Sequence, residues 1–216
     1  ILNKPAGLPV HPSMGHRDDT LANGLSWYFK EKGEDFAFRA ISRLDRDTTG
    51  LLIIAKNNAS ACLLSRQVSH QLIEKEYLAA ASGCIPESGT IDAPIRRADD
   101  SVIERMVDFS CGDPARTHYE RLFYDPVSDL SLARIRLETG RTHQIRVHFL
   151  HIGHPLTGDF LYNPDFSRIS RQALHSWKLR FLHPITKAPM QFTAPMPDDM
   201  IALFPSYSEA HLNPFG

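Results

Sequence analysis

The chain has 216 residues, of which 42% are hydrophobic and 23% charged, the composition of an ordinary globular protein and not of a fibrous or disordered one. Its 25 acidic and 24 basic residues give a net charge of −1, so the overall charge does not indicate a nucleic-acid-binding protein, although arginines cluster locally. No apolar run approaches the roughly 20 residues that a membrane helix needs, and three separated cysteines indicate neither disulfides nor a zinc cage. We expect a cytoplasmic protein without membrane contact.

The first helix follows an N-terminal stretch rich in proline and glycine, which predicts the end of a strand running into an extended loop. Thr20 can cap this helix, with Leu21, Leu25 and Tyr28 on one face. Gly33 should end it.

A charged loop follows in the stretch 41–55, where Arg43, Asp45, Arg46 and Asp47 precede a five-residue apolar run. The run predicts a strand covered on both faces, so Asp45 should lie near the mouth of a core. A carboxylate that guanidinium groups keep ionised at this place is a candidate reactive group. The residues alone leave two interpretations open, a structural cluster that closes the loop and a reactive carboxylate.

A second helix should begin after Asn57 or Asn58. Its predicted core stripe consists of apolar side chains at three- and four-residue spacing, with Cys62 on the core side: Ala61, Leu64, Val68 and Leu72.

Strands dominate the rest of the chain. The patterns predict them at 74–83, 117–123, 130–137, 177–182 and 190–194. The stretch 86–113, rich in proline, glycine and charge, predicts a meandering insertion or short hairpins. A parity shift between Leu132 and Ala133 indicates a bulge, and Arg134 and Arg136 should share the polar face of their strand.

Thr142 can begin a third helix that Gly153 ends. Its core stripe is Ile145, Phe149 and Ile152. Arg146 lies about 100° from this stripe beside His143, so both side chains can look into a cleft at the edge of the core. We find no internal repeat or linker and expect one α+β domain spanning residues 1–216.

Histidines near this helix raise the possibility of a metal site, since four fall within twelve residues and Asp159 follows: His143, His148, His151 and His154. Helical geometry argues against it, because His143 points about 140° away from His148 and no ligand motif is present. Positions at helix ends and in turns are a better explanation for these histidines than a metal site is, so we predict no metal. Cys62 lacks the setting of a nucleophile, and the glycines lack phosphate-loop spacing, so we predict no nucleotide cofactor.

Two features remain with alternatives open. The helix start with Arg141 and Thr142 could hold a phosphate group. Tyr77, on a predicted strand, could either stack on a base or belong to the core.

The chain resembles the RluA-like family of RNA pseudouridine synthases. Three stretches in order carry the resemblance: RLDRDTTGLL at 43–52, KEY at 75–77 and LETGRTHQIRVH at 137–148. Further stretches extend it over practically the whole chain: NKPAGLPVHP at 3–12, GHPLTGD at 153–159 and the closing strands at 174–195.

The resemblance implies a mixed, mainly antiparallel sheet with flanking helices and a central active-site cleft. It implies a cofactor-free isomerisation in which uracil is detached from ribose through N1 and rejoined through C5, in ribosomal or transfer RNA. Asp45 would be the nucleophile, Tyr77 would stack on the uracil and help remove the C5 proton, and Arg146 would pair with Asp45. Arg43 would occupy the space of the flipped nucleotide. For binding we add Arg141, Thr142 and His143, expect a monomer, and assign Asp47 to loop structure.

One position departs from the family pattern, because Ser42 stands where relatives commonly have histidine. We also expect no small N-terminal RNA-binding domain in this chain, which many relatives carry. Two rival interpretations are a non-catalytic RNA-binding protein of the same fold and a histidine-metal hydrolase. The intact Asp45, Tyr77 and Arg146 speak against the first.

Overall fold

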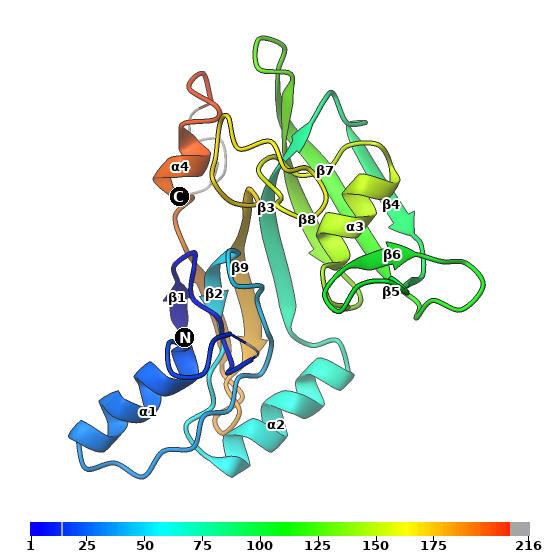
Figure 1. The fold of residues 1–216 in the computed structure, drawn as a ribbon. Coiled ribbons are helices and arrows are strands. Elements are labelled where there is room, and N and C mark those ends of the chain that lie inside the picture. Colours follow the sequence, from blue (N-terminus) through cyan, green and yellow to red (C-terminus); the bar gives the residue numbers. More distant parts are fainter. Residues whose placement is uncertain (14, 208–216) are drawn as a thin grey trace. The chain divides into compact units, whose positions relative to one another are not determined.

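A computed structural model describes residues 1–13 and 15–207 (Figure 1). The chain forms two compact units, the first from 1–75 and 176–194 and the second from 76–175 and, among the described residues, 195–207. The elements are a mixture of helices and mainly antiparallel strands, so the predicted α+β class is confirmed. The assignment of residues 1–216 to a single domain stays a prediction. No helix within the described ranges is long and apolar enough to cross a membrane.

The first unit is built on short antiparallel strands. β1 (Leu2–Lys4) pairs with β2 (Thr49–Leu52), and β10 (Pro189–Thr193) pairs with β9 (Leu174–Leu182). Their core contains the apolar run that the sequence predicted after the charged loop, with Leu51, Ile53 and Ala55 buried. These residues pack in one cluster with Leu64 of the second helix and with Leu179 and Phe181 of β9. The charged loop therefore lies beside a buried strand.

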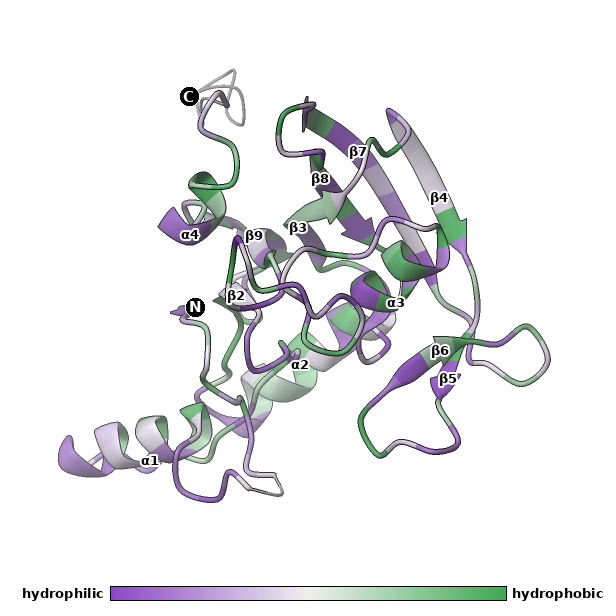
Figure 2. Ribbon diagram, turned by 45° about the horizontal axis from the view of Figure 1, so that its top comes forward, coloured by the Kyte–Doolittle hydropathy of each residue, from purple (hydrophilic) through white to green (hydrophobic). Residues whose placement is uncertain are grey.

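α1 (Leu21–Glu31) begins and ends as predicted. Thr20 forms a capping box with Asn23, and Gly33 adopts φ 67° after the last turn. The predicted apolar face is wrong at Tyr28, which is 44% exposed, and no residue of the helix is fully buried. The helix is hydrophobic near its start and hydrophilic at its end (Figure 2).

α2 (Asn58–Ser69) is capped by Asn57, whose side chain accepts from Ser60 N at 2.8 Å. Its predicted stripe is wrong in its second half, because Val68 and Leu72 are exposed, and Cys62 is exposed too. Gln67 takes the inward position instead. Its amide donates to Leu182 O at 2.8 Å and accepts from Leu182 N at 3.0 Å, which satisfies the end of β9.

The second unit is an antiparallel sheet with the order β3, β8, β7, β4. These strands are β3 (Glu74–Ser82), β8 (Leu130–Leu137), β7 (Arg116–Asp125) and β4 (Ser88–Asp92). A separate hairpin joins β5 (Ile95–Arg97) to β6 (Arg105–Val107), which confirms the short hairpin predicted in the insertion. A four-residue helix, α4 (Asp198–Ile201), follows late in the chain.

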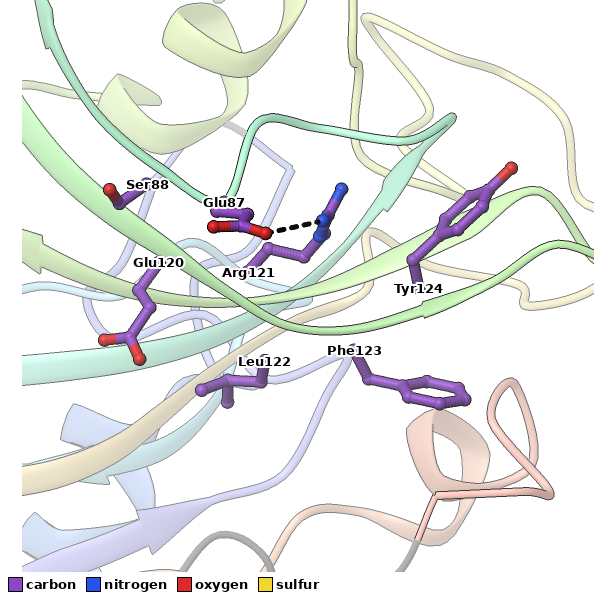
Figure 3. A pocket seen from close by; sticks show the side chains of 7 residues that line it. All are labelled: Glu87, Ser88, Glu120, Arg121, Leu122, Phe123 and Tyr124. Carbon is purple, nitrogen blue, oxygen red and sulfur yellow. Dashed lines mark ion pairs between the residues drawn. The ribbon is translucent and has the colours of Figure 1, made fainter.

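A bulge interrupts β7 between Arg121 and Phe123, opposite Ala133 and Leu132. The predicted bulge thus occurs at the right level of the strand pair but in the partner strand. β8 needs none because residues 130–133 are all buried, so both of its faces accept apolar side chains there. The bulged residues line a shallow pocket (Figure 3).

α3 (Gln144–His151) packs on β7, with the rings of Phe149 and Tyr119 5.6 Å apart. It begins two residues later than predicted, because His143 adopts a left-handed conformation with φ 58°. Gly153, at φ 82°, ends it as predicted.

Candidate active site

Asp45 lies in a tight turn of the first unit, partly buried, immediately before β2. Thr48 N–H donates to the Asp45 carbonyl at 3.1 Å, which closes the turn. Arg46 bonds to the Asp47 carboxylate through Nε at 3.1 Å and Nη2 at 2.9 Å. This ion pair fits the predicted loop-structuring role of Asp47, which stays a prediction.

Lys4 stabilises this loop by side-chain hydrogen bonds to backbone carbonyls. Its side chain is 1% exposed, and Nζ donates to Pro5 O at 2.8 Å, Leu8 O at 2.9 Å and Arg46 O at 2.7 Å. A buried ammonium thus ties the N-terminal loop to the residue after Asp45 and places positive charge at the base of the turn. Sequence reasoning missed Lys4, because one lysine in a proline-rich loop carries no periodic signal.

Gly50 fixes the strand that follows. It has φ 105°, and a Cβ atom there would lie 2.2 Å from Ser176 O. Only glycine allows β2 to approach the β9 backbone this closely, and Ser176 Oγ donates to Leu51 O at 3.0 Å beside it. The glycine of the first motif thus has a packing role.

Arg146, in the second unit, forms a buried bidentate ion pair with Asp159. Nε lies 2.6 Å from Oδ2 and Nη2 lies 2.7 Å from Oδ1, while the two side chains are 1% and 0% exposed. Two parallel hydrogen bonds fix the plane of the guanidinium group. The helical wheel placed Arg146 at the edge of the core, and the structure shows that it is buried.

The sequence considered alone suggested Asp159 only as a metal ligand and did not reveal it as the partner of Arg146. Its Oδ1 also accepts from Leu161 N at 3.0 Å and Tyr162 N at 3.3 Å. Gly158, at φ 71°, allows the turn before it, where a Cβ atom would lie 2.3 Å from Arg171 O. The motif continuation at 153–159 was the available signal.

Aromatic rings flank the guanidinium group. Arg146 Cζ lies 5.3 Å from the ring centroid of Phe160 and 5.0 Å from that of Tyr162. His143 Nδ1 is 3.0 Å from the Tyr162 hydroxyl. The structure therefore brings His143 and Arg146 together through Tyr162.

The other predicted residues are spread over both units. Tyr77 lies on β3 opposite Ile135 and is 7% exposed. Arg43 is exposed, and Thr142 is half-buried. Asp45 and Arg43 belong to the first unit, whereas Tyr77, Thr142 and Arg146 belong to the second. The predicted pairing of Arg146 with Asp45 stays a prediction.

Arg141 contacts the loop before β7. Its Nε donates to Pro114 O at 3.1 Å, and Nη1 lies 3.8 Å from Asp113 Oδ2. The backbone N–H of Arg141 donates to Gln144 Oε1 at 2.9 Å. These contacts fit a loop-anchoring role, and the phosphate-binding role of this helix start stays a prediction.

The histidines considered for a metal have protein partners. His148 contacts Thr117 Oγ1 and Ala93 O, each at 2.8 Å, and His154 contacts Ser82 O at 2.8 Å. Burial lowers the pKa of His148, because desolvation disfavours the charged ring. Within the described ranges, no three His, Cys, Asp or Glu side chains gather where they could hold a metal ion.

Residues 1–151 match the family described as RNA pseudouridylate synthase, and this match includes the Asp45 loop and α3. The chain belongs to this family. The recognition of a pseudouridine synthase from the sequence motifs is therefore confirmed.

Relatives of this pseudouridine synthase are similar to it over most of the chain. It is 41% identical over 206 residues to an uncharacterized RNA pseudouridine synthase, YjbO, of Bacillus subtilis, covering 94% of this chain and 71% of the relative. It is 42% identical over 212 residues to the ribosomal large subunit pseudouridine synthase D of Nitrosomonas europaea, covering 94% of this chain and 61% of the relative.

A solved structure supports the fold as well. Human RNA pseudouridylate synthase domain containing 1 aligns with a TM-score of 0.72 at 29% identity, over 89% of this chain and 78% of that chain. This likeness agrees with the α+β class and the antiparallel sheet of the pseudouridine synthase described above.

Proposed function

We propose that this chain converts uridine to pseudouridine in large-subunit ribosomal RNA, with Asp45 as the nucleophile. In this reaction the bond between uracil N1 and the ribose carbon breaks and a bond from uracil C5 to the same carbon forms. The proton leaves C5, and N1 ends protonated. Because the atoms are only rearranged, the reaction needs no redox or energy-supplying cofactor.

The observation that carries the proposal is the construction of the Asp45 turn. The turn is closed by its own backbone, is bonded at the Arg46 carbonyl by the buried ammonium of Lys4, and precedes β2, in which Gly50 packs closely on β9. A carboxylate carried on a backbone turn that is fixed in this way is suited to nucleophilic attack. This turn belongs to the part of the chain that matches the family.

Several chemical pathways use this carboxylate. It can attack the sugar carbon, add to the pyrimidine ring or stabilise a glycal-forming pathway. All three require Asp45, so the proposal concerns the residue and the overall isomerisation.

The other roles follow from chemistry and position. Arg146, fixed in its plane by Asp159, would pair with Asp45 during the reaction. Tyr77 would stack on the uracil and help remove the C5 proton. Arg43 is exposed and would fill the space left by the flipped base, whose extrusion costs a few kcal/mol.

Ribosomal RNA is the favoured substrate because relatives named ribosomal large subunit pseudouridine synthase D are 42% identical in Nitrosomonas europaea and 39% identical in Escherichia coli. Transfer RNA is the alternative. We further propose that the protein acts as a monomer in the cytoplasm.

The experiment maps pseudouridines in total ribosomal and transfer RNA from cells with and without the gene. Cells that carry the Asp45→Asn variant form the third arm. We expect one or a few large-subunit sites to disappear both without the gene and in the variant. Unchanged ribosomal RNA would overturn the substrate assignment, and sites retained in the Asp45→Asn cells would overturn the role of the aspartate.

A further inference from the structure

Tyr162 contacts Arg146, Asp159 and the β5–β6 hairpin of the second unit. Its backbone N–H donates to Asp159 Oδ1 at 3.3 Å, and its ring lies 5.0 Å from Arg146 Cζ. Its hydroxyl accepts from the backbone N–H of Arg105 at 2.8 Å. The side chain of Tyr162 thus contacts the guanidinium group and the β5–β6 hairpin, while its backbone contacts the carboxylate that binds the guanidinium group.

The hydroxyl makes the hydrogen bond from Tyr162 to the hairpin. A phenol oxygen both donates and accepts, so it can receive the Arg105 N–H and still share a hydrogen bond with His143 Nδ1 at 3.0 Å. The ring of Tyr162 also packs beside a buried cluster formed by Ile95 and Val147. The hydroxyl therefore links the hairpin to His143 at the start of α3, and the ring adds apolar contacts with both elements.

The loop that carries Tyr162 is itself well fixed. Asn163 N–H donates to Asp159 O at 2.8 Å, and the Asn163 amide donates to Ser82 Oγ and Leu156 O, each at 3.2 Å. A ring on such a loop can hold a neighbouring side chain in one place, because the loop does not follow the side chain's motion.

We propose that Tyr162 is a positioning residue for Arg146, and that its hydroxyl uses the β5–β6 hairpin and His143 as supports. The ring limits the position of the guanidinium group from one face while Asp159 fixes its plane. The proposal rests on the function proposed above, since it assigns Tyr162 to the same reaction.

The test measures tritium release from RNA labelled at uracil C5 under single and multiple turnover. Tyr162→Phe keeps the ring and removes the hydroxyl. We expect kcat to fall about five- to tenfold because the hydroxyl's hydrogen bonds to Arg105 and His143 are lost, while KM for RNA changes less than about twofold. Tyr162→Leu removes the ring as well and should lower kcat further.

A second pair of variants tests the same bond from the hairpin. Arg105→Pro removes the backbone donor, and Arg105→Ala removes the same side chain but keeps the donor. The ratio of their kcat values should not exceed the effect of Tyr162→Phe, because Tyr162→Phe also removes the hydrogen bond to His143. Combining Arg105→Pro with Tyr162→Phe should produce no loss beyond that of Tyr162→Phe, because Tyr162→Phe already lacks the hydrogen bond to Arg105.

Tyr124→Phe is the matched control, since it removes a tyrosine hydroxyl that donates to Asp129 Oδ1 at 2.8 Å elsewhere in the unit. Wild-type kcat in Tyr162→Phe, or a fall in thermal stability with unchanged kcat in the folded protein, would overturn the proposal. If the wild-type protein releases no tritium from any RNA, the proposed function fails and this inference fails with it. If the wild-type protein is active, the variants test the role of Tyr162 separately from the proposed function.

Discussion

Arg146 and Asp159 hold each other in a buried bidentate ion pair, with Nε 2.6 Å from Oδ2 and Nη2 2.7 Å from Oδ1. Asp159→Ala would leave a guanidinium group buried without this partner. We expect the free energy of unfolding to fall by about 3–5 kcal/mol, measured by urea denaturation. Asp159→Asn should lower kcat strongly, because only one acceptor oxygen would remain and the plane of the Arg146 guanidinium group would no longer be fixed by two hydrogen bonds.

A second pair in the same unit supplies the control. Arg171 binds Asp199 with the same two-atom geometry, at 2.6 Å and 2.7 Å, but the Asp199 side chain is 43% exposed. Asp199→Asn should destabilise the protein less and leave kcat at the wild-type value. Equal loss of activity in both asparagine variants would contradict a specific role for Asp159.

Gly50 should tolerate no side chain. Gly50→Ala combines φ 105° with a Cβ atom 2.2 Å from Ser176 O, so we expect a loss of stability of about 2–4 kcal/mol and a matching loss of activity. Gly140→Ala, in the third motif, meets no atom within 4 Å and should remain near wild type. Thermal unfolding of both variants tests this, and equal melting temperatures would contradict the packing role of Gly50.

Lys4 should matter for activity more than a surface lysine. Lys4→Met leaves three carbonyl acceptors without their ammonium donor, which should destabilise the protein by about 2–3 kcal/mol and lower kcat by loosening the Asp45 turn. Lys56→Met removes an exposed ion pair with Glu34 and should change both little. The same urea and tritium-release assays measure both variants. A wild-type kcat in the folded Lys4→Met variant would contradict the conclusion that Lys4 supports the Asp45 turn.

His148 should make stability depend on pH. Burial lowers its pKa below the unfolded value near 6.5, so the neutral ring is favoured in the folded protein. This contribution is fully present above about pH 6.5 and is lost as the pH falls toward the folded pKa. Urea unfolding between pH 8 and 5 should show a shallower decline in His148→Gln than in wild type. Parallel curves would contradict it.

Local signals in the sequence predicted much of the fold. The Thr20 cap, the glycines after α1 and α3, and the apolar run of β2 act within a few residues, so pattern alone identified them. The stripe of α2 failed for a tertiary reason. Gln67 is buried because it bonds to the end of β9, which no helical periodicity encodes.

The candidate site shows the same division. The motifs identified Asp45, Tyr77 and Arg146, but the partners of charged groups depend on how the chain folds back on itself. Lys4 reaches the Arg46 carbonyl 42 positions away, and Asp159 reaches Arg146 from a separate loop. Such pairs could not be chosen from spacing.

The central claim is that Asp45 performs the chemistry, and the most direct measurement is tritium release from RNA labelled at uracil C5 by Asp45→Asn. RNA binding by the same folded protein is measured in parallel, and Asp47→Asn, in the same turn, is the control. We predict that Asp45→Asn abolishes tritium release while binding RNA nearly as well as wild type, and that Asp47→Asn retains activity. Tritium release by Asp45→Asn, or equal loss of release and binding in the folded variant, would contradict the account.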